Sequence, residues 1–246
     1  MPNAPLKKLG LARALSKLGF CSRAQAVQLI RAGKVRVNGA RRRDPETPIR
    51  LGKDRIDVDG QAITAREKIY LALNKPRGIV TTASDEKGRD TVYSLLDADL
   101  PWVAPVGRLD KASEGLLLLT NDSDWGARVT APETHLDKTY HVQIGKVADA
   151  ALIDTLKNGV HTKEGDTLGV KAASLLRKGE RNSWLEIVLD EGKNRHIRRM
   201  LETLSIKVLR LIRVAIGPLA LGHLAKGAVR QLTPDERLAL DRAMYR

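Results

Sequence analysis

The N-terminal part of the chain carries apolar residues at helical spacing, which predicts two short helices between residues 9 and 31. The apolar positions are Leu11, Leu15, Leu18, Ala26, Val27 and Ile30. Gly19-Phe-Cys21 separates the two helices, and Ser22 with Gln25 has the spacing of a capping box that starts the second one. Gly33 is placed to end that helix.

An alternating pattern after Gly33 predicts strands. Lys34-Val-Arg-Val37 alternates basic and apolar side chains, and Asn38-Gly39 is a strong signal for a tight hairpin. Ile56-Asp-Val-Asp-Gly60 repeats the alternation and ends in a second turn. We therefore expect residues 9–63 to form a small αα-then-β domain, followed by a short polar linker at 64–68.

Residues 69–246 intersperse the two kinds of pattern. Strands are predicted at 69–73, 116–120, 138–144, 184–189 and 207–214, and a turn at 74–78. Helices are predicted at 92–96, 123–129, 149–156, 194–204 and 234–244. Because there is no strict strand-helix-strand repeat, the pattern favours an α+β fold. We expect one domain over 69–246, with a mixed, largely antiparallel sheet flanked by helices.

The charge of the chain indicates a polyanionic partner. Its 246 residues carry a net charge of +14, which suits nucleic acid. Aromatic residues make up only 3%, too few for successive base stacking, so we expect contacts to the phosphates and shape of folded RNA or DNA. No apolar run is long enough to span a membrane, residues 1–8 lack the core of a signal peptide, and Cys21 is the only cysteine. These features predict a cytoplasmic protein without membrane contact.

Cations cluster around the second helix and the first hairpin, at Arg23, Arg31, Lys34, Arg36, Arg41, Arg42 and Arg43. Such a cluster forms either an ordinary solvated face or a phosphate-binding surface, and the net charge favours the second. The segment from Ser22 to Gly39 resembles the small RNA-binding domain named after small-subunit ribosomal protein four. The resemblance extends the candidate RNA contacts to Ser22.

Asp110 is the leading candidate for chemistry. It lies in a Gly107-Arg-Leu-Asp turn between Arg108 and Lys111, ahead of the apolar run 116–119. A carboxylate on a loop between cations is a candidate nucleophile or general base. The alternative is a surface turn followed by a buried strand. Phosphate-loop, dinucleotide-binding and metal-ligand motifs are absent from the sequence, so we expect no metal and no organic cofactor.

Two further segments are candidates. Tyr140 lies on a predicted strand, where a core tyrosine is the simpler explanation. Lys193, Arg195, Arg198 and Arg199 surround the start of a predicted helix, a place suited to anionic groups. One of these arginines could also lie against a buried carboxylate.

The segments 107–121, 138–140 and 191–200, in this order, resemble the bacterial ribosomal RNA pseudouridine synthases of the RsuA/RluB/RluE/RluF branch, and the resemblance extends from about residue 9 to 232. His196 stands where that family frequently has glutamine. The resemblance implies that uridine in structured ribosomal RNA is isomerised without a cofactor, with Asp110 as the catalytic carboxylate. A single carboxylate also differs from the pair that a glycoside hydrolase needs.

The resemblance also implies roles for the residues around Asp110. Arg108 helps to hold a flipped-out uridine, Tyr140 stacks on its uracil and Ile197 packs against the base. Arg198 pairs with Asp110. Lys193, Arg195 and Arg199 join the RNA contacts.

Two other functions stay open at this point. The first is a non-catalytic ribosomal RNA-binding or ribosome-assembly protein that keeps this fold, although plain binding would not require Asp110, Tyr140 and Arg198. The second is a nucleoside hydrolase or transglycosylase, which the lack of a second paired acid and the RNA-binding N-terminal domain disfavour. We expect a monomer that acts on naked RNA or on an assembly intermediate, with a preference for large-subunit RNA. The target uridine, and whether Asp110 adds covalently or forms a glycal, are left undetermined by the sequence.

Overall fold

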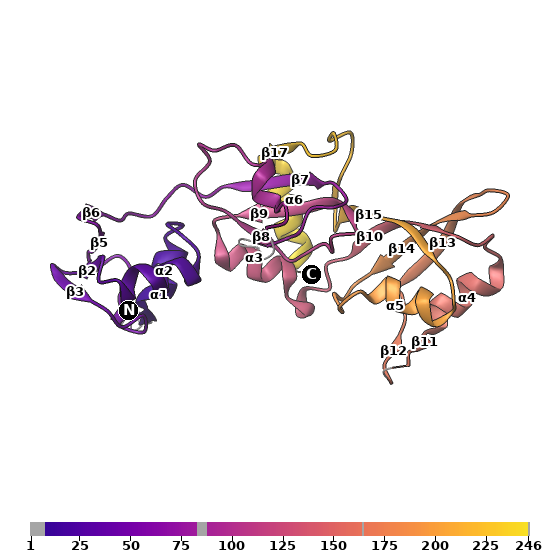
Figure 1. Ribbon diagram of the computed structural model, residues 1–246, viewed down its shortest axis with the longest axis horizontal. Coiled ribbons are helices and arrows are strands. Elements are labelled where there is room, and N and C mark those ends of the chain that lie inside the picture. Colours follow the sequence, from indigo (N-terminus) through magenta and orange to yellow (C-terminus); the bar gives the residue numbers. More distant parts are fainter. Residues whose placement is uncertain (1–7, 83–87, 164, 246) are drawn as a thin grey trace. The chain divides into compact units, whose positions relative to one another are not determined.

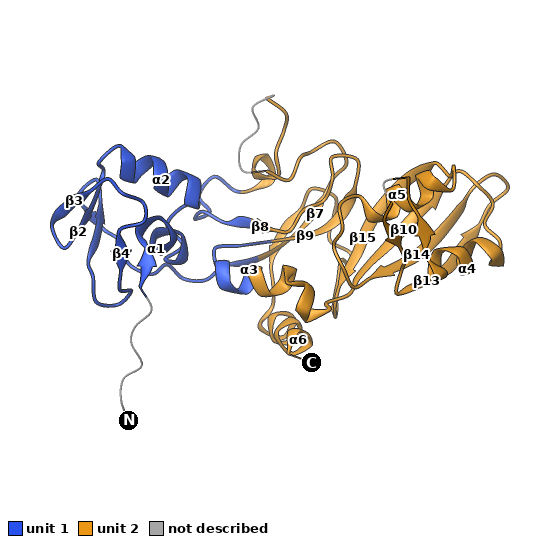
Figure 2. Ribbon diagram, turned by 90° about the horizontal axis from the view of Figure 1, so that it is seen from below, with its two compact units in different colours: residues 1–70, 97–104, 119–125 blue, residues 71–96, 105–118, 126–246 orange. Residues whose placement is uncertain are grey.

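The computed structural model describes residues 8–82, 88–163 and 165–245, so residues 1–7, on which most of the signal-peptide expectation rests, lie outside the described part. The chain divides into two compact units, shown along the chain in Figure 1 and in separate colours in Figure 2. Unit 1 comprises residues 1–70, 97–104 and 119–125, and unit 2 comprises 71–96, 105–118 and 126–246. The expected domain limits, 9–63, 64–68 and 69–246, stay a prediction.

The two predicted N-terminal helices are present as α1 (Leu11–Lys17) and α2 (Arg23–Arg31). The capping box forms as expected: the Ser22 side chain accepts a hydrogen bond from the Gln25 amide, and the Gln25 side chain accepts one from the Ser22 amide. Gly33 follows α2 with a φ of 71°, in the left-handed region that favours glycine.

Short strands complete the N-terminal part. A four-stranded sheet has the order β3 (Ala40–Arg42), β2 (Val35–Val37), β5 (Ile56–Val58) and β6 (Gln61–Ala62). The predicted hairpin turn is present, with positive φ at both Asn38 and Gly39. A second pair joins β1 (Leu9–Gly10) to β4 (Pro48–Ile49). These two-residue strands escaped prediction because they are too short to show an alternating pattern.

The central sheet has the strand order β13-β14-β10-β15-β9-β7-β17, with β16 beside β15 and β8 beside β9. Its strands are β7 (Tyr70–Lys75), β8 (Ala104–Val106), β9 (Glu114–Thr120), β10 (Lys138–Ile144), β13 (Ala172–Lys178), β14 (Ser183–Leu189), β15 (Val208–Ile216), β16 (Leu219–Ala220) and β17 (Val229–Gln231). β15 pairs with β9 in parallel, whereas β10 is antiparallel to both β14 and β15. The predicted α+β fold with a mixed, largely antiparallel sheet is confirmed.

The helices of the second part are α3 (Ser123–Thr130), α4 (Ala150–Asn158), α5 (His196–Thr203) and α6 (Pro234–Met244), and the small pair β11 (Val160–His161) and β12 (Thr167–Leu168) lies between α4 and β13. Leu152 of α4 and Ile197 of α5 belong to one buried cluster with Val142 of β10 and Leu185 of β14. These two helices therefore cover one face of the sheet. No helix of the described residues is long and apolar enough to cross a membrane.

Three details differ from the sequence predictions. The predicted helix at 92–96 is a 3-10 helix, Val92–Leu95. β7 continues to Lys75, so the turn predicted from Asn74 begins later. α5 begins at His196 instead of Asn194, because Arg195 adopts a left-handed conformation with a φ of 50°.

Candidate active site

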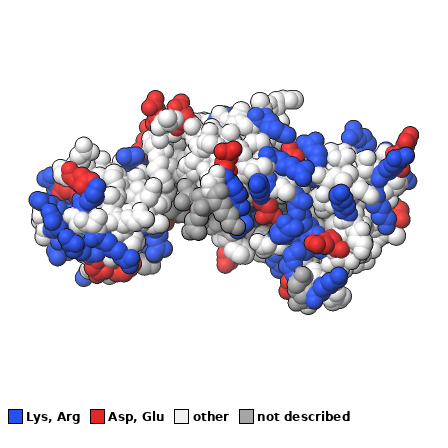
Figure 3. All heavy atoms as spheres, in the orientation of Figure 1, with Lys and Arg blue, Asp and Glu red and all other residues white. Residues whose placement is uncertain are grey.

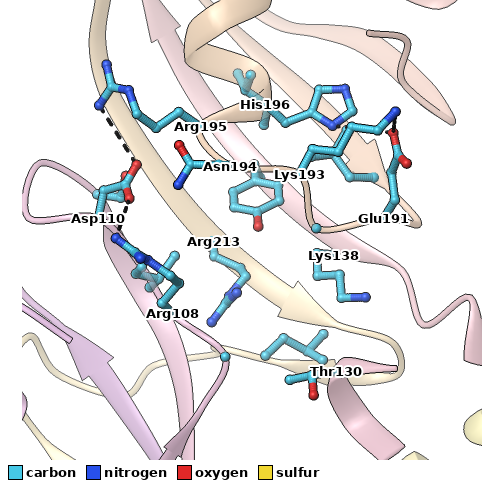
Figure 4. Close-up of a pocket in the computed structure, with 18 of the residues that line it drawn as sticks. Arg108, Asp110, Thr130, Lys138, Glu191, Lys193, Asn194, Arg195, His196 and Arg213 are labelled. Carbon is cyan, nitrogen blue, oxygen red and sulfur yellow. Dashed lines mark ion pairs between the residues drawn. The ribbon is translucent and has the colours of Figure 1, made fainter. Parts of the chain in front are cut away.

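A cavity of about 300 Å³ opens in unit 2 between the loop that follows β8, the strands β10 and β15, and the segment before α5. Its lining includes Arg108, Asp110, Tyr140, Lys193, Arg195 and Ile197. The structure therefore brings together six of the residues that the sequence singled out, from three distant parts of the chain. Figure 4 shows Asp110 and the charged side chains that surround it.

Asp110 lies between two arginines in this cavity. Its carboxylate is 3.8 Å from the Arg108 guanidinium and 4.0 Å from that of Arg195 (Figure 4). The Asp110 side chain is 22% exposed, so it is accessible to a ligand while the two cations stabilise its negative charge.

The backbone of the Asp110 loop is fixed by Lys75, which is fully buried at the end of β7. The Lys75 ammonium donates to the carbonyls of Pro76, Asp110 and Ser113 at 3.0, 3.2 and 3.0 Å. Burial lowers the pKa of Lys75 to about 8, although the nearby charges of Asp110 and Glu114 oppose this shift. The sequence did not indicate Lys75, because a lysine before proline is typical of an exposed turn.

Arg198 holds the same loop from the other side. Its guanidinium donates to the Ala112 carbonyl at 2.9 Å and to the Ser113 hydroxyl at 3.3 Å. Burial lowers the pKa of Arg198, followed by the charge of Arg195, and the charge of Asp110 opposes the change. Among the described residues the ion pairs of Asp110 are with Arg108 and Arg195, so the expected direct pair of Arg198 with Asp110 is not present.

Gly115 allows β9 to approach β15 closely. The two strands pair in parallel, with Gly115 opposite Arg213, and the φ of Gly115 is 101°. A Cβ at this position would overlap the carbonyl oxygen of Arg213. Next to it, the buried Glu114 pairs with both Arg210 and Lys226. Burial would raise the pKa of Glu114, but hydrogen bonds from these two cations lower it below its ordinary value.

One face of the sheet forms the floor of the cavity. On β10, Lys138 and Tyr140 lie on the same face, and Tyr140 is paired with Arg213 of β15. A bulge at this point of the ladder turns both Arg213 and Ile216 toward the cavity, although residues three apart on a regular strand face opposite sides. The sequence did not indicate Arg213, since a bulge leaves no local pattern, and Lys138 stood in a candidate segment only as a basic neighbour of Tyr140.

The other cations predicted near α5 have acidic partners. Lys193 pairs with Glu191 at 2.9 Å, and Arg199 pairs with Asp166 at 2.6 Å. The Arg199 side chain thereby ties α5 to the turn between β11 and β12, and its expected role as an RNA contact stays a prediction. His196 is 3% exposed, and burial lowers its pKa.

The basic residues of unit 1 lie at its surface. Arg23, Arg31, Lys34, Arg36, Arg41, Arg42 and Arg43 are all exposed, and Figure 3 shows Lys and Arg side chains gathered over this unit. Arg36 and Arg41 are direct partners across the β2–β3 hairpin. Like charges at paired positions destabilise a hairpin, so this arrangement suits a surface that binds a polyanion. Ser22 uses its hydroxyl to cap α2.

The chain combines an accessible carboxylate set among arginines in unit 2 with a basic surface on unit 1, and such a basic surface is typical of nucleic-acid-binding proteins. The comparisons with known proteins define the class. Residues 69–203 match the family model described as RNA pseudouridylate synthase, and residues 9–56 match the S4 domain. The chain therefore belongs to the RNA pseudouridylate synthase family, and it is an RNA-binding enzyme with pseudouridine synthase activity.

Individual relatives agree with this result. The chain is 36% identical to "Ribosomal large subunit pseudouridine synthase B" of Bacillus subtilis over 92% of this chain and 93% of the relative. It is 40% identical to an uncharacterized RNA pseudouridine synthase of Rickettsia bellii, over 91% and 96% of the two chains. A solved pseudouridylate synthase aligns with a TM-score of 0.66 at 30% identity, covering 94% of this chain and 99% of that one.

Proposed function

We propose that this enzyme isomerises a specific uridine of ribosomal RNA to pseudouridine, with Asp110 as the carboxylate that acts on a flipped-out uridine. The observation that carries the proposal is the position of Asp110, accessible in a 300 Å³ cavity between Arg108 and Arg195. The similarity to the Bacillus subtilis ribosomal large subunit enzyme supports ribosomal RNA as the substrate and favours the large subunit.

The chemistry needs one ionised carboxylate. Pseudouridine formation breaks the bond between the uracil nitrogen and the ribose, turns the detached base and rejoins it through a ring carbon, so no atom is gained or lost. Asp110 starts the reaction either by adding to the sugar or by removing a sugar proton. Both routes use the anion, which the two neighbouring guanidinium groups stabilise.

The base fits against the apolar part of the cavity. Leu109, Tyr140 and Ile197 line it, and the aromatic ring of Tyr140 offers a surface on which uracil stacks. Arg108 is 72% exposed in its side chain, which suits it to hold the RNA from which the uridine has turned out.

Unit 1 supplies the docking surface in this proposal. We assign structured ribosomal RNA, naked or in an assembly intermediate, to the exposed cations of residues 9–63, and catalysis to residues 69–246 of a cytoplasmic monomer. Residues 64–68 link the two.

The first test replaces Asp110 by Asn, which keeps the shape of the side chain and removes its charge. Ribosomal RNA from a deletion strain, treated with carbodiimide, locates the uridine that loses its modification. Transcripts that contain this uridine should be converted by the wild-type enzyme and not by Asp110→Asn. Affinity for RNA should stay within about tenfold, because phosphate contacts carry it. Turnover by Asp110→Asn above about 1% of wild type, with deamidation back to Asp excluded by mass measurement, would remove Asp110 from the chemistry.

The second test concerns the docking surface. Replacement of Arg36 and Arg41 by Gln should weaken RNA binding and lower the slope of log affinity against log salt by about 2, since each phosphate contact contributes roughly one. Arg177→Gln together with Lys178→Gln on β13 is the matched control with the same loss of charge. Equal slopes of log affinity against log salt for wild type and for the variant at Arg36 and Arg41 would mean that this basic cluster is a solvated surface without phosphate contacts.

A further inference from the structure

Lys138 and Arg213 form a pair of cations on the cavity floor. Lys138 lies on β10 and Arg213 on β15, and the bulge described above brings both to the cavity. Figure 4 shows them in the part of the cavity where Thr130 also lies, with Arg213 between Lys138 and Arg108. Lys138 is half-buried, and Arg213 is only 6% exposed.

Neither cation has an acidic partner of its own in the described part of the chain. Arg213 donates through Nε to the Leu116 carbonyl at 2.7 Å, and its buried Nη2 has no hydrogen-bond partner there. Burial lowers the pKa of Lys138, and the charge of Arg213 lowers it further, while Asp137 and Asp190 act in the opposite direction. The two groups thus repel each other in a place where water screens them poorly.

Three of the acids around the cavity are already paired with other cations. These pairs are Asp110–Arg108, Asp110–Arg195, Glu191–Lys193 and Asp137–Lys171. Asp190 lies 3.9 Å from the His135 imidazole and forms no ion pair with Lys138 or Arg213 among the described residues. Two adjacent cations without an ion pair cost stability, unless an anion occupies the space between them during function.

We propose that Lys138 and Arg213 form a subsite for one phosphodiester of the RNA strand, adjacent to the uridine that reacts at Asp110. The inference rests on the proposed function and assigns a second contact point within the same cavity. A phosphodiester carries a full negative charge and accepts hydrogen bonds from both an ammonium and a guanidinium. The uracil is neutral before the reaction, and the apolar side chains Leu109 and Ile197 offer it a better surface.

This subsite fixes the position of the strand. A phosphate held at the floor and a ribose held at Asp110 are two points of one nucleotide chain, so the floor contact adds affinity for the strand and sets its register. Because the phosphate keeps its charge throughout the reaction, the contact acts equally on the bound substrate and on the transition state. Its loss should therefore raise KM and leave kcat nearly unchanged.

The test uses Lys138→Met, which removes the charge and keeps the length of the side chain. The RNA is a stem-loop that contains the mapped uridine, prepared also with an uncharged methylphosphonate at the phosphate on its 5′ side or on its 3′ side. Lys138→Met should raise KM for the unmodified RNA by about tenfold with kcat within about threefold. At one of the two positions the methylphosphonate should raise the KM of the wild-type enzyme by a similar factor. With that modified RNA, Lys138→Met should raise KM little further.

Two controls make the result specific. Lys138→Arg keeps the charge and should restore KM to within about threefold of wild type, which separates a phosphate contact from a folding defect. Lys157→Met removes an exposed lysine of α4 that is outside the cavity, and it should leave KM unchanged.

Two results would overturn the subsite. One is a fall in kcat for Lys138→Met with KM unchanged, which would mean that the cations act on charge that develops on the detached base. The other is that the increases in KM caused by Lys138→Met and by the methylphosphonate multiply fully at both methylphosphonate positions. Failure of the proposed function is a separate observation: the wild-type enzyme would then form no pseudouridine in the unmodified RNA.

Discussion

Replacement of Lys75 by Met should destabilise the enzyme by about 3 kcal/mol at pH 7. The change leaves the carbonyls of Pro76, Asp110 and Ser113 without their donor, at roughly 2 kcal/mol each. It also removes a buried ammonium, whose pKa of about 8 in the folded protein is below the ordinary 10.5. That difference corresponds to about 3 kcal/mol of burial cost, which offsets roughly half of the loss.

The lowered pKa of Lys75 also predicts how the stability difference between wild type and variant changes with pH. Below pH 8 the Lys75 ammonium is protonated in both the folded and the unfolded chain, so its burial cost is fully present. Between pH 8 and 10.5 the unfolded chain binds more protons, and the wild-type stability contributed by this group rises with pH. Lys75→Met lacks the group and lacks this rise. The difference in stability between wild type and variant should therefore grow by about 2 kcal/mol from pH 7 to pH 9.5.

Urea unfolding of both proteins at pH 7 and pH 9.5, followed by circular dichroism, measures the difference. Lys157→Met provides a control for the loss of a lysine at the surface. Equal stability of wild type and Lys75→Met at pH 7 would show that the three carbonyls do not depend on this side chain. A difference that does not change with pH would show that Lys75 has an ordinary pKa.

Three further outcomes are expected. Gly115→Ala should lower the free energy of unfolding by about 2–5 kcal/mol in urea titrations, because a positive φ and contact with the Arg213 backbone both oppose a side chain. Unchanged stability would contradict the close approach of β9 and β15. Arg198→Met should lower single-turnover rates by about 10- to 100-fold with RNA affinity nearly unchanged, because the Asp110 loop loses an anchor; a defect confined to filter binding would place Arg198 among the RNA contacts instead. Burial raises the pKa of Cys21 to about 11, so this thiol should react with disulfide reagents at pH 8 only after unfolding, and rapid labelling of the native protein would contradict its burial.

The sequence predicted correctly those features that are formed by residues close together in the chain. The capping box at Ser22 and the Asn38-Gly39 turn each involve residues close in sequence, and both formed as predicted. β13 was missed because Ala172–Lys178 is an edge strand with largely exposed side chains, which leaves little alternation to detect. Lys75 could not be found in this way, since Ser113, one of its acceptors, is 38 residues away.

The arginine beside Asp110 illustrates how a small boundary error affects a site. Helical side chains are spaced by about 100° per residue, and this spacing does not apply to a residue that lies outside the helix with a left-handed backbone, as Arg195 does. α5 begins at His196, after the left-handed Arg195. Arg195 consequently reaches the Asp110 carboxylate, and Arg198 reaches the backbone behind it.

The parallel pairing of β9 with β15 joins segments that are far apart in the sequence, so the catalytic cavity can form only after most of the chain has been synthesised. Arg198 contacts a residue 86 positions earlier, and Arg213 one 97 positions earlier. The hairpins of residues 34–62, in contrast, close between near neighbours and fold early as the chain emerges from the ribosome. During synthesis the basic surface is thus complete while the strand that completes the cavity has yet to be made. We expect nascent or truncated chains to bind RNA without modifying it.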